Sequence, residues 1–262
     1  MPRLAVSRIK IRRLAVPSLA RFDLFCRLAA PPRTSGGVGG GRLFVSFQPE
    51  RELIVARLLY LETSPRKERS HSIAVAQAFL AAYQGLHPED EIETWDLWNT
   101  RLPEFDGLAI NAKYRILHGQ SHSAEEAAAW QVVVDVFRRF ANADKYLLSL
   151  PMWNFGIPYK LKHFIDVIAQ PGLTFHFSPE TGYQGLVTGR PITVVYARGG
   201  AYGSAEAAAI DFQKPYLEHF LRFIGFTDIR PIVVEPMLGA PDAVNTAKAA
   251  AIEAAQREAE RM

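Results

Sequence analysis

An aromatic loop near the middle of the chain holds the first residues that could do chemistry. The apolar segment Leu147–Leu150 is typical of a buried strand and ends at Pro151, and a helix is predicted to begin at Pro158. The residues between them present apolar and π surface and one side-chain amide: Met152, Trp153, Asn154 and Phe155. These groups could hold a heteroaromatic ring by its face and by its polar edge. Filling of the core by the same aromatic residues is the equally open alternative.

A second loop carries groups that suit a phosphate. It follows the predicted strand Val55–Leu61 and contains three hydroxyls, Ser64, Ser70 and Ser72, around the start of a helix. Hydroxyls, free amides and the positive end of a helix dipole together bind anions. Helix capping by Ser70, with Arg66–Arg69 as a solvated charge run, explains the loop without any ligand. Taken alone, the loop favours that second explanation.

Alternating strands and helices must position these loops. Apolar or alternating segments predict five strands, at Val55–Leu61, Glu91–Leu97, Tyr146–Leu150, Ile192–Ala197 and Ile229–Val234. Helices are predicted at Ser70–Gln84, Ala124–Ala141, Tyr159–Ala169, Ala209–Phe223 and from Pro241 onward. We expect a loop-rich passage at Trp98–Ser121 and a small hairpin within Gly172–Arg190. This succession predicts an α/β fold: a doubly wound, five-stranded parallel sheet, with helices on both faces and the strand order 2-1-3-4-5.

This strand order places the two loops together. The first and third strands are neighbours at the switch point of the sheet, where open α/β sheets bind ligands at the carboxyl ends of their strands. The loops that follow Leu61 and Leu150 should therefore share one ligand. A molecule with both a phosphate and a flat ring fits the two loops at once.

Composition separates the chain into two unlike parts. The 262 residues are 48% hydrophobic and 22% charged, which is ordinary for a globular protein. No apolar run approaches the roughly 18 residues of a membrane span, so we expect no membrane partner. Residues 1–57 contain eleven Lys and Arg against three Asp and Glu, a net charge of +8, whereas the remaining residues carry −5.

The first 52 residues differ from the rest. They are rich in Arg, poor in acidic residues and include the spacer SGGVGGG, so we expect a weakly ordered basic, Gly-rich extension before a domain formed by residues 53–262. A transit peptide or a nucleic-acid-binding arm would share this composition. No regular interleaving of basic and aromatic residues supports such an arm, and we expect no nucleic-acid partner. The single cysteine, Cys26, excludes a disulfide within the chain and favours a reducing, cytoplasmic compartment.

Other chemistry finds little support. His118 and His122 are four residues apart, but no carboxylate or cysteine completes a metal-binding set, so we expect no metal. The chain also lacks a G-x-S-x-G elbow and any catalytic triad signature.

Four motifs together resemble a known family. They are PMWNFGIPYKLKHFID at residues 151–166, GLTF at 172–175, GLVTGR at 185–190 and ARGG at 197–200. In these motifs the chain resembles the bacterial FMN-dependent NAD(P)H azoreductases and quinone reductases, from about Leu58 to the C-terminus. The resemblance implies a flavodoxin-like homodimer with FMN at two sites in the subunit interface. It also implies NADH or NADPH as co-substrate and a quinone or azo compound as acceptor.

Residue by residue, the resemblance implies the parts of a cofactor site. The FMN phosphate would be held by Ser64, Ser70, His71 and Ser72. The isoalloxazine ring would lie against Met152, Trp153, Asn154 and Phe155, with main-chain amides at its polar edge. The pyrimidine end would be approached by Ala197, Arg198, Gly199 and Gly200, whose backbone donors could stabilise negative charge on the reduced flavin.

The chain departs from the family pattern at two points. Ala197 stands where the family usually has Ser, so one hydroxyl contact is lost. Many members carry a His shortly after the glycine pair, where this chain has Ala201, Tyr202 and Gly203. We expect Tyr202 to take the place of that His, and Asn154 to be the other side chain that supports the reaction. The flavin would carry the chemistry.

These observations lead to one hypothesis and one alternative. The hypothesis is a ping-pong oxidoreductase in which a hydride passes from NAD(P)H to bound FMN and two electrons then pass to a quinone or an azo compound. The alternative is a flavodoxin-like carrier that passes electrons to a protein partner. Such a carrier usually presents an acidic docking surface, and this domain is only mildly acidic.

Overall fold

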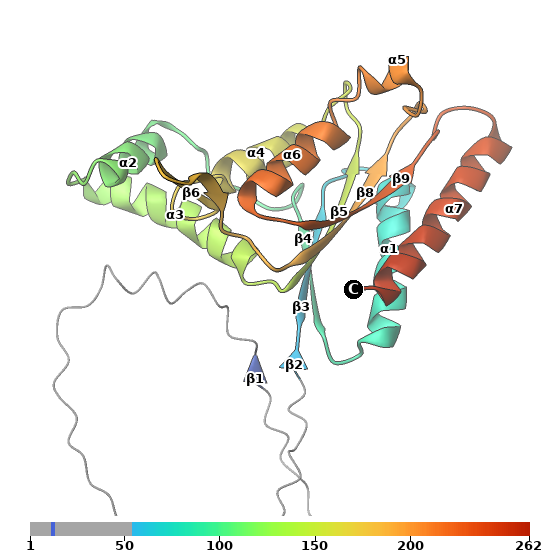
Figure 1. Cartoon of the computed structure of the whole chain (residues 1–262), viewed down its shortest axis with the longest axis horizontal. Coiled ribbons are helices and arrows are strands. Elements are labelled where there is room, and N and C mark those ends of the chain that lie inside the picture. The colour runs from blue at the N-terminus through green and yellow to red at the C-terminus, as the bar shows by residue number, and fades with distance from the viewer. Residues whose placement is uncertain (1–11, 14–53) are drawn as a thin grey trace, which may run out of the picture. The chain divides into compact units, whose positions relative to one another are not determined.

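The computed structural model describes residues 12–13 and 54–262 (Figure 1). The chain divides into two units, residues 1–55 and residues 56–262. In the first unit, strand β1 (Arg12–Arg13) pairs in parallel with β2 (Ile54–Val55). Apart from those two arginines, the expected extension at residues 1–52 lies outside the described residues, as does Cys26.

A five-stranded parallel sheet is the frame of the second unit. Its strands are β3 (Arg57–Glu62), β4 (Glu91–Asp96), β5 (Lys145–Pro151), β8 (Pro191–Ala197) and β9 (Asp228–Val234). They are ordered β4-β3-β5-β8-β9, and each neighbouring pair runs in parallel. The predicted order 2-1-3-4-5 is therefore confirmed. The second of these strands along the chain, the polar β4, lies at an edge of the sheet, as its composition predicts.

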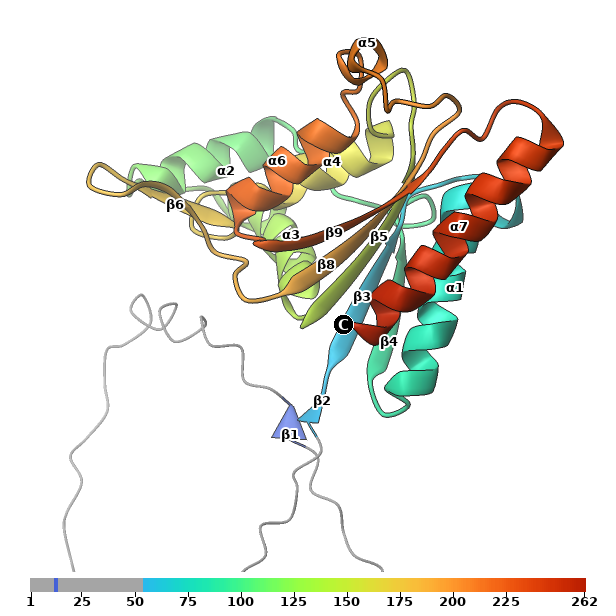
Figure 2. The same cartoon turned by 45° about the vertical axis from the view of Figure 1, so that its right-hand side comes forward.

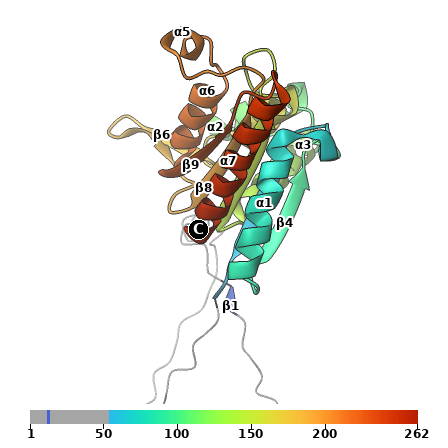
Figure 3. The same ribbon diagram turned by 90° about the vertical axis from the view of Figure 1, so that its right-hand side faces the viewer.

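Helices cover both faces of this sheet. Helices α1 (His71–Leu86) and α7 (Pro241–Glu260) lie side by side on one face, and Figures 1 and 3 show them close together. Helices α3 (Ala124–Ala141), α4 (Tyr159–Ile168) and α6 (Lys214–Ile224) lie on the other face (Figure 2). No helix in the described part of the chain combines the length and the apolar character needed to cross a membrane.

Each face has its own apolar core. The core under α1 and α7 combines large residues such as Phe79 and Tyr83 with the small Ala251 and Ala255, which let α7 approach α1 closely. The core on the other face is built mainly from Leu, Ile and Val side chains and also holds aromatic rings, of which Trp95 and Phe164 meet edge to face with ring centroids 5.2 Å apart. Burial of these side chains fixes the strand ends that carry the predicted loops.

The passage Trp98–Ser121 is loop-rich but also includes a helix that the sequence analysis does not predict. It contains helix α2 (Gly107–Leu117), whose first amides at Leu108 and Ala109 donate to the Asp106 carboxylate at 3.0 and 3.2 Å. An Asp at the N-cap is a helix start signal, but Gly107 directly after it disguises the pattern.

The predicted helix Ala209–Phe223 begins too early. A short helix α5 (Ala205–Ala208) ends before it, and α6 starts at Lys214. The Asp211 carboxylate accepts the amides of Gln213 and Lys214 at 2.9 and 3.1 Å, so the segment before α6 takes a turn held by this side chain.

The predicted hairpin is confirmed as β6 (Phe175–Ser178) and β7 (Gly182–Gly185), an antiparallel pair. It rests on the end of α6, where the Val187 amide donates to the Ile224 carbonyl at 2.8 Å. Gly185 touches the same backbone. A Cβ atom at Gly185 would lie 2.2 Å from the Gly225 nitrogen, so only glycine fits there.

Substitution of Gly185 should therefore destabilise the fold. We expect Gly185→Ala to lower the free energy of unfolding by roughly 2–3 kcal/mol, because backbone atoms rather than a flexible side chain must move. Gly203→Ala is the matched control, since a Cβ atom there meets nothing within 4 Å. Urea unfolding of both variants measures the difference. Equal stability of the two would contradict the close packing of the hairpin against α6.

Candidate functional site

The carboxyl ends of β3 and β5 lie side by side, so the two predicted loops meet. Glu62 is the register partner of Ser149. Beyond that pair, both the amide and the hydroxyl of Thr63 donate to the Ser149 carbonyl, at 3.2 and 2.8 Å. The buried hydroxyls of Tyr60 and Ser149 are 2.8 Å apart, and burial raises the pKa of Tyr60 well above its ordinary value. The predicted switch point is therefore present as a hydrogen-bonded unit.

The first loop presents buried hydroxyls at a helix N-terminus. Ser64, Ser70 and Ser72 are all buried, and the Ser70 and Ser72 hydroxyls are 3.1 Å apart. Ser70 caps α1 by accepting the Ile73 amide at 3.4 Å, as the capping interpretation predicts. This cap leaves the first-turn amides of His71 and Ser72 without an acceptor in the helix. Hydroxyls and free amides at the positive end of a long helix are a donor set that suits a phosphate.

His71 stands in the first turn of the same helix and is half-buried. Burial lowers the pKa of His71, and the positive charges of Lys248 and Arg66 lower it further. The imidazole is therefore largely neutral near pH 7. A neutral imidazole offers one N–H donor without adding a charge to the loop.

The second loop is a tight turn with unusual backbone angles. The amides and carbonyls of Trp153 and Gly156 exchange two hydrogen bonds of 2.9 Å. Between them Asn154 and Phe155 have φ of +47° and +67°, the pattern of a type I′ turn. Such angles are disfavoured for Phe and store strain. The amides of Asn154 and Phe155 have no acceptor in the described part of the chain, and the Phe155 side chain is 49% exposed.

Aromatic rings line this turn on one side. The Trp153 ring lies 5.4 Å from that of Trp98 and 6.1 Å from that of Tyr159, measured between centroids. The amide of Met152 donates to the Ala197 carbonyl at 2.8 Å, so the start of the loop is fixed to the end of β8. Of the loop's amides, those at the tip of the turn remain available to a ligand.

The third predicted segment, at 197–200, uses Arg198 for structure. The Arg198 side chain is only 4% exposed and forms ion pairs with Asp211 at 2.8 Å and Glu235 at 3.3 Å. Its Nε atom also donates to Gln213 at 3.1 Å, and its amide donates to the Val234 carbonyl at 3.0 Å. Neither the guanidinium nor the backbone amide of Arg198 is therefore open to a ligand.

The glycines after Arg198 differ in the space around them. A Cβ atom at Gly199 would lie 2.8 Å from Leu238 Cδ1, whereas one at Gly200 would meet nothing closer than Tyr202 Cε2 at 3.7 Å. The amides of Gly199 and Gly200 have no acceptor among the described residues. The half-buried Tyr202 ring lies 5.4 Å from the Arg198 guanidinium and packs against it.

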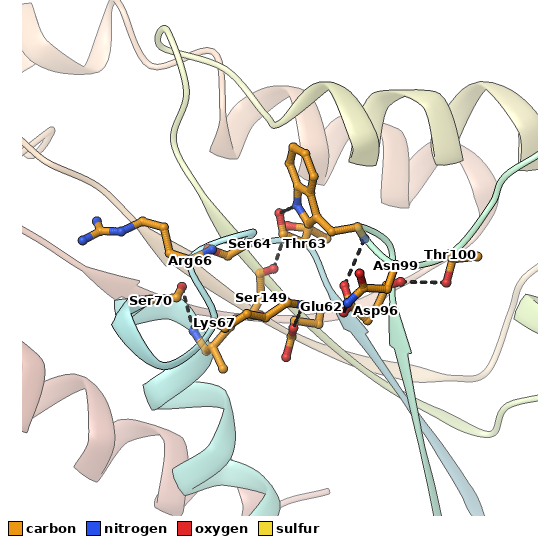
Figure 4. A network of polar contacts seen from close by, with 12 residues as sticks. Glu62, Thr63, Ser64, Arg66, Lys67, Ser70, Asp96, Asn99, Thr100 and Ser149 are labelled. Carbon is orange, nitrogen blue, oxygen red and sulfur yellow. Dashed lines mark hydrogen bonds and ion pairs between the residues drawn. The ribbon is translucent and has the colours of Figure 1, made fainter.

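One polar network at this edge was missed by the sequence analysis (Figure 4). The Lys67 ammonium bridges Glu62, at 2.6 Å, and Asp96. Burial alone would lower the pKa of Lys67, but hydrogen bonds to Asp96 and Glu62 outweigh it and raise the pKa. Interpretation of Arg66–Arg69 as a solvated charge run is therefore wrong at Lys67. Glu62 and Asp96 end two neighbouring parallel strands, which is the signal that could have found the network.

Comparison with known proteins places the chain in a family. A family model described as a flavodoxin-like fold matches residues 56–259. The FMN-dependent NADH:quinone oxidoreductase of Desulfotalea psychrophila is 55% identical over 184 residues, covering 70% of this chain and 87% of that protein. The protein of that name from Nitratidesulfovibrio vulgaris is 51% identical over 205 residues, covering 78% of this chain and 98% of that protein. This chain belongs to the family of FMN-dependent NADH:quinone oxidoreductases.

Solved structures agree with this family. The azoreductase of Bacillus anthracis strain Sterne is 31% identical with a TM-score of 0.74, covering 79% of this chain and all of that one. An FMN-dependent NADH-azoreductase of Bacillus anthracis, solved in complex with FMN, is 28% identical with a TM-score of 0.69 and covers 78% of this chain.

The donor set of this family member fits FMN. The loop at Ser64–Ser72 offers the hydroxyls and amides that a phosphate needs. The turn at Asn154–Phe155 offers two free amides beside aromatic rings, and Gly199 and Gly200 offer two more. No group of three or more His, Cys, Asp or Glu side chains able to hold a metal gathers in the described part of the chain.

Removal of Arg198 should unfold this edge of the oxidoreductase. We expect Arg198→Met to lower the free energy of unfolding by about 3–5 kcal/mol, because Asp211 and Glu235 would lose the cation that balances them in a poorly solvated place. Arg257→Met is the control: among the described residues this exposed arginine pairs only with Glu253, and its loss should cost less than about 0.5 kcal/mol. Urea unfolding of the flavin-free protein near pH 7 provides the measurement. Similar stability of the two variants would show that the buried pairs are not structural.

Proposed function

We propose that this chain is an FMN-dependent NAD(P)H oxidoreductase that reduces quinones and aromatic azo compounds. One observation carries the proposal: a hydroxyl-rich helix N-terminus and a turn with free amides meet at the carboxyl ends of β3 and β5. The relatives named FMN-dependent NADH:quinone oxidoreductase and the azoreductase structures support the same assignment.

In this proposal the protein binds and orients while the cofactor reacts. Ser64, Ser70, His71 and Ser72 would hold the FMN phosphate, with the neutral His71 adding a donor. Met152, Trp153, Asn154 and Phe155 would meet the ring system, and the amides of Gly199 and Gly200 would face its pyrimidine end. Ala197 contributes its carbonyl to Met152, and the Arg198 side chain pairs with Asp211 and does not meet the ligand. Bound FMN supplies hydride acceptance from NAD(P)H and transfer of two electrons to the acceptor.

The electron-carrier alternative is not favoured. The two relatives described above are named as oxidoreductases, and the two azoreductase structures as enzymes too. The chain also presents aromatic side chains at the turn, since Phe155 is 49% and Tyr159 is 61% exposed. Such surface suits a small aromatic substrate better than a charged protein partner.

Assembly, location and domain limits are further parts of the proposal. We propose a homodimer with a site at each subunit interface, supported by the exposed apolar side chains of α2 and the hairpin, which include Leu108, Tyr114, Leu117, Phe177 and Tyr183. We also propose a cytoplasmic location, and residues 53–262 as the FMN-binding domain with residues 1–52 as an extension.

Anaerobic absorption spectra test the function directly. The purified protein, loaded with FMN, should show flavin bands that disappear when NADH or NADPH is added and return when a simple quinone follows. Comparing the two nucleotides at equal concentration also identifies the preferred donor. Absence of flavin bands after incubation with FMN would overturn the proposal, and a bound flavin that neither nucleotide reduces would favour the electron carrier.

A single glycine tests the position of the site. We expect Gly200→Val to weaken FMN binding by about tenfold or more, because its side chain would stand beside two amides proposed to face the ring. The melting temperature without flavin should change little, since a Cβ atom at this position meets only Tyr202 at 3.7 Å. Gly203→Ala, which adds a Cβ atom into open space, is the control. Unchanged FMN affinity in Gly200→Val would place the ring elsewhere.

A further inference from the structure

We propose that Lys67 is a positioning residue that holds the phosphate-binding loop and neutralises two carboxylates beside it. The proposal rests on the proposed function, and it assigns to Lys67 no contact with the phosphate itself. Figure 4 shows Lys67 beside Glu62 and Asp96, whereas the Arg66 side chain extends away from them. The clamp is the set Glu62, Lys67 and Asp96.

Both the side chain and the backbone of Lys67 are held by hydrogen bonds. Its ammonium binds Glu62, at 2.6 Å, and Asp96, which terminate β3 and β4. Its carbonyl accepts the amide of Ser70 at 2.9 Å. Ser70 is the cap of α1 and one of the hydroxyls proposed to bind phosphate. The position of that hydroxyl therefore depends on where Lys67 is held.

The backbone of Lys67 is in a conformation that needs such support. Its φ is +49°, in the left-handed region that lysine seldom adopts. The left-handed residue turns the chain within Ser64–Ser70, so that Ser70 can begin the helix. Two ion pairs at the end of the side chain compensate for this backbone cost.

Charge gives the clamp a second role. Glu62 is only 7% exposed and lies two residues before Ser64, and Asp96 lies at the end of the neighbouring strand. Without Lys67, two carboxylates would face each other close to a site proposed for a phosphate dianion. Unbalanced negative charge near that site would disfavour the binding of an anion. The lysine thus removes a repulsion that would act on FMN and not on riboflavin, which has no phosphate.

The clamp also joins the phosphate loop to the aromatic wall. Asp96 accepts the amide of Trp98 at 3.0 Å, and the Trp98 indole N–H donates to the Thr63 carbonyl at 2.7 Å. The same indole packs against Trp153 in the turn. These contacts are made by Asp96, Thr63 and Trp98 themselves and not by Lys67, so the aromatic wall should stay in place when the lysine is replaced.

Equilibrium titration of the flavin-free protein with FMN and with riboflavin tests the proposal. We expect Lys67→Met to raise the Kd for FMN by about tenfold or more and that for riboflavin by less than about threefold. Lys67→Arg, which keeps the charge, should bind FMN within about threefold of the unmodified chain. Arg69→Met is the matched control, because Arg69 is an exposed cation of the same loop with no ion pair in the described part of the chain, and it should bind both flavins almost normally.

The outcomes distinguish a failure of the Lys67 proposal from a failure of the proposed FMN-dependent function. Lys67→Gln, which keeps a hydrogen-bond donor without the charge, provides the same comparison if the Met variant does not fold, as judged by thermal melting. Unchanged FMN affinity, equal loss for both flavins, or equal loss in Arg69→Met would overturn the clamp. If the unmodified chain binds neither flavin, the proposed function fails and the clamp fails with it.

Discussion

The pairing of β3 with β5 is the interaction on which the site depends. The buried Tyr60 and Ser149 hydroxyls satisfy each other, and Thr63 reaches the Ser149 carbonyl with two donors. Because these contacts lie at the last paired residues, the two loops leave the sheet at the same level. A slip of one residue would turn Ser149 to the other face and leave Tyr60 without a partner. The register of one strand pair thus sets the relation between the loop proposed for the phosphate and the loop proposed for the ring.

The distribution of donors around this edge follows a simple division. Two cations near the loops turn inward: Lys67 meets Glu62 and Asp96, and Arg198 meets Asp211 and Glu235. The groups left for a ligand are the hydroxyls of the first loop and the backbone amides that have no acceptor among the described residues. Such ion pairs hold the loops because removal of one charge would leave a partner with little access to water uncompensated, as at Glu62 and Asp211. Amides then supply the ligand donors without a mobile charge, and amides of a fixed backbone need little reorganisation when a ligand changes its charge.

Much of this arrangement could be predicted from sequence, for identifiable reasons. The five strands are apolar runs bounded by turn residues, so their order and the meeting of the two loops followed from general rules. Helix α2 was not predicted because Gly107 follows its cap. The predicted start of α6 is too early because Asp211 interrupts an otherwise helical pattern. The two ion clusters were missed because each joins a residue to a partner from a distant strand or segment, Asp96 in one and Glu235 in the other. Lys67 and Asp96 become neighbours only when β4 pairs with β3, and no local pattern records that pairing.

The turn at Asn154 and Phe155 shows why a local rule is broken here. Two-residue turns of this type favour Asn followed by Gly, since both positions need a positive φ, yet the second position is Phe. The fold sustains this strain with two hydrogen bonds between Trp153 and Gly156 and a third from the Phe212 amide to the Phe155 carbonyl. A glycine would relax the backbone but would remove a half-exposed ring from the edge of the proposed site. Local strain that the rest of the structure must hold in place is expected where binding, and not stability, selects the residue.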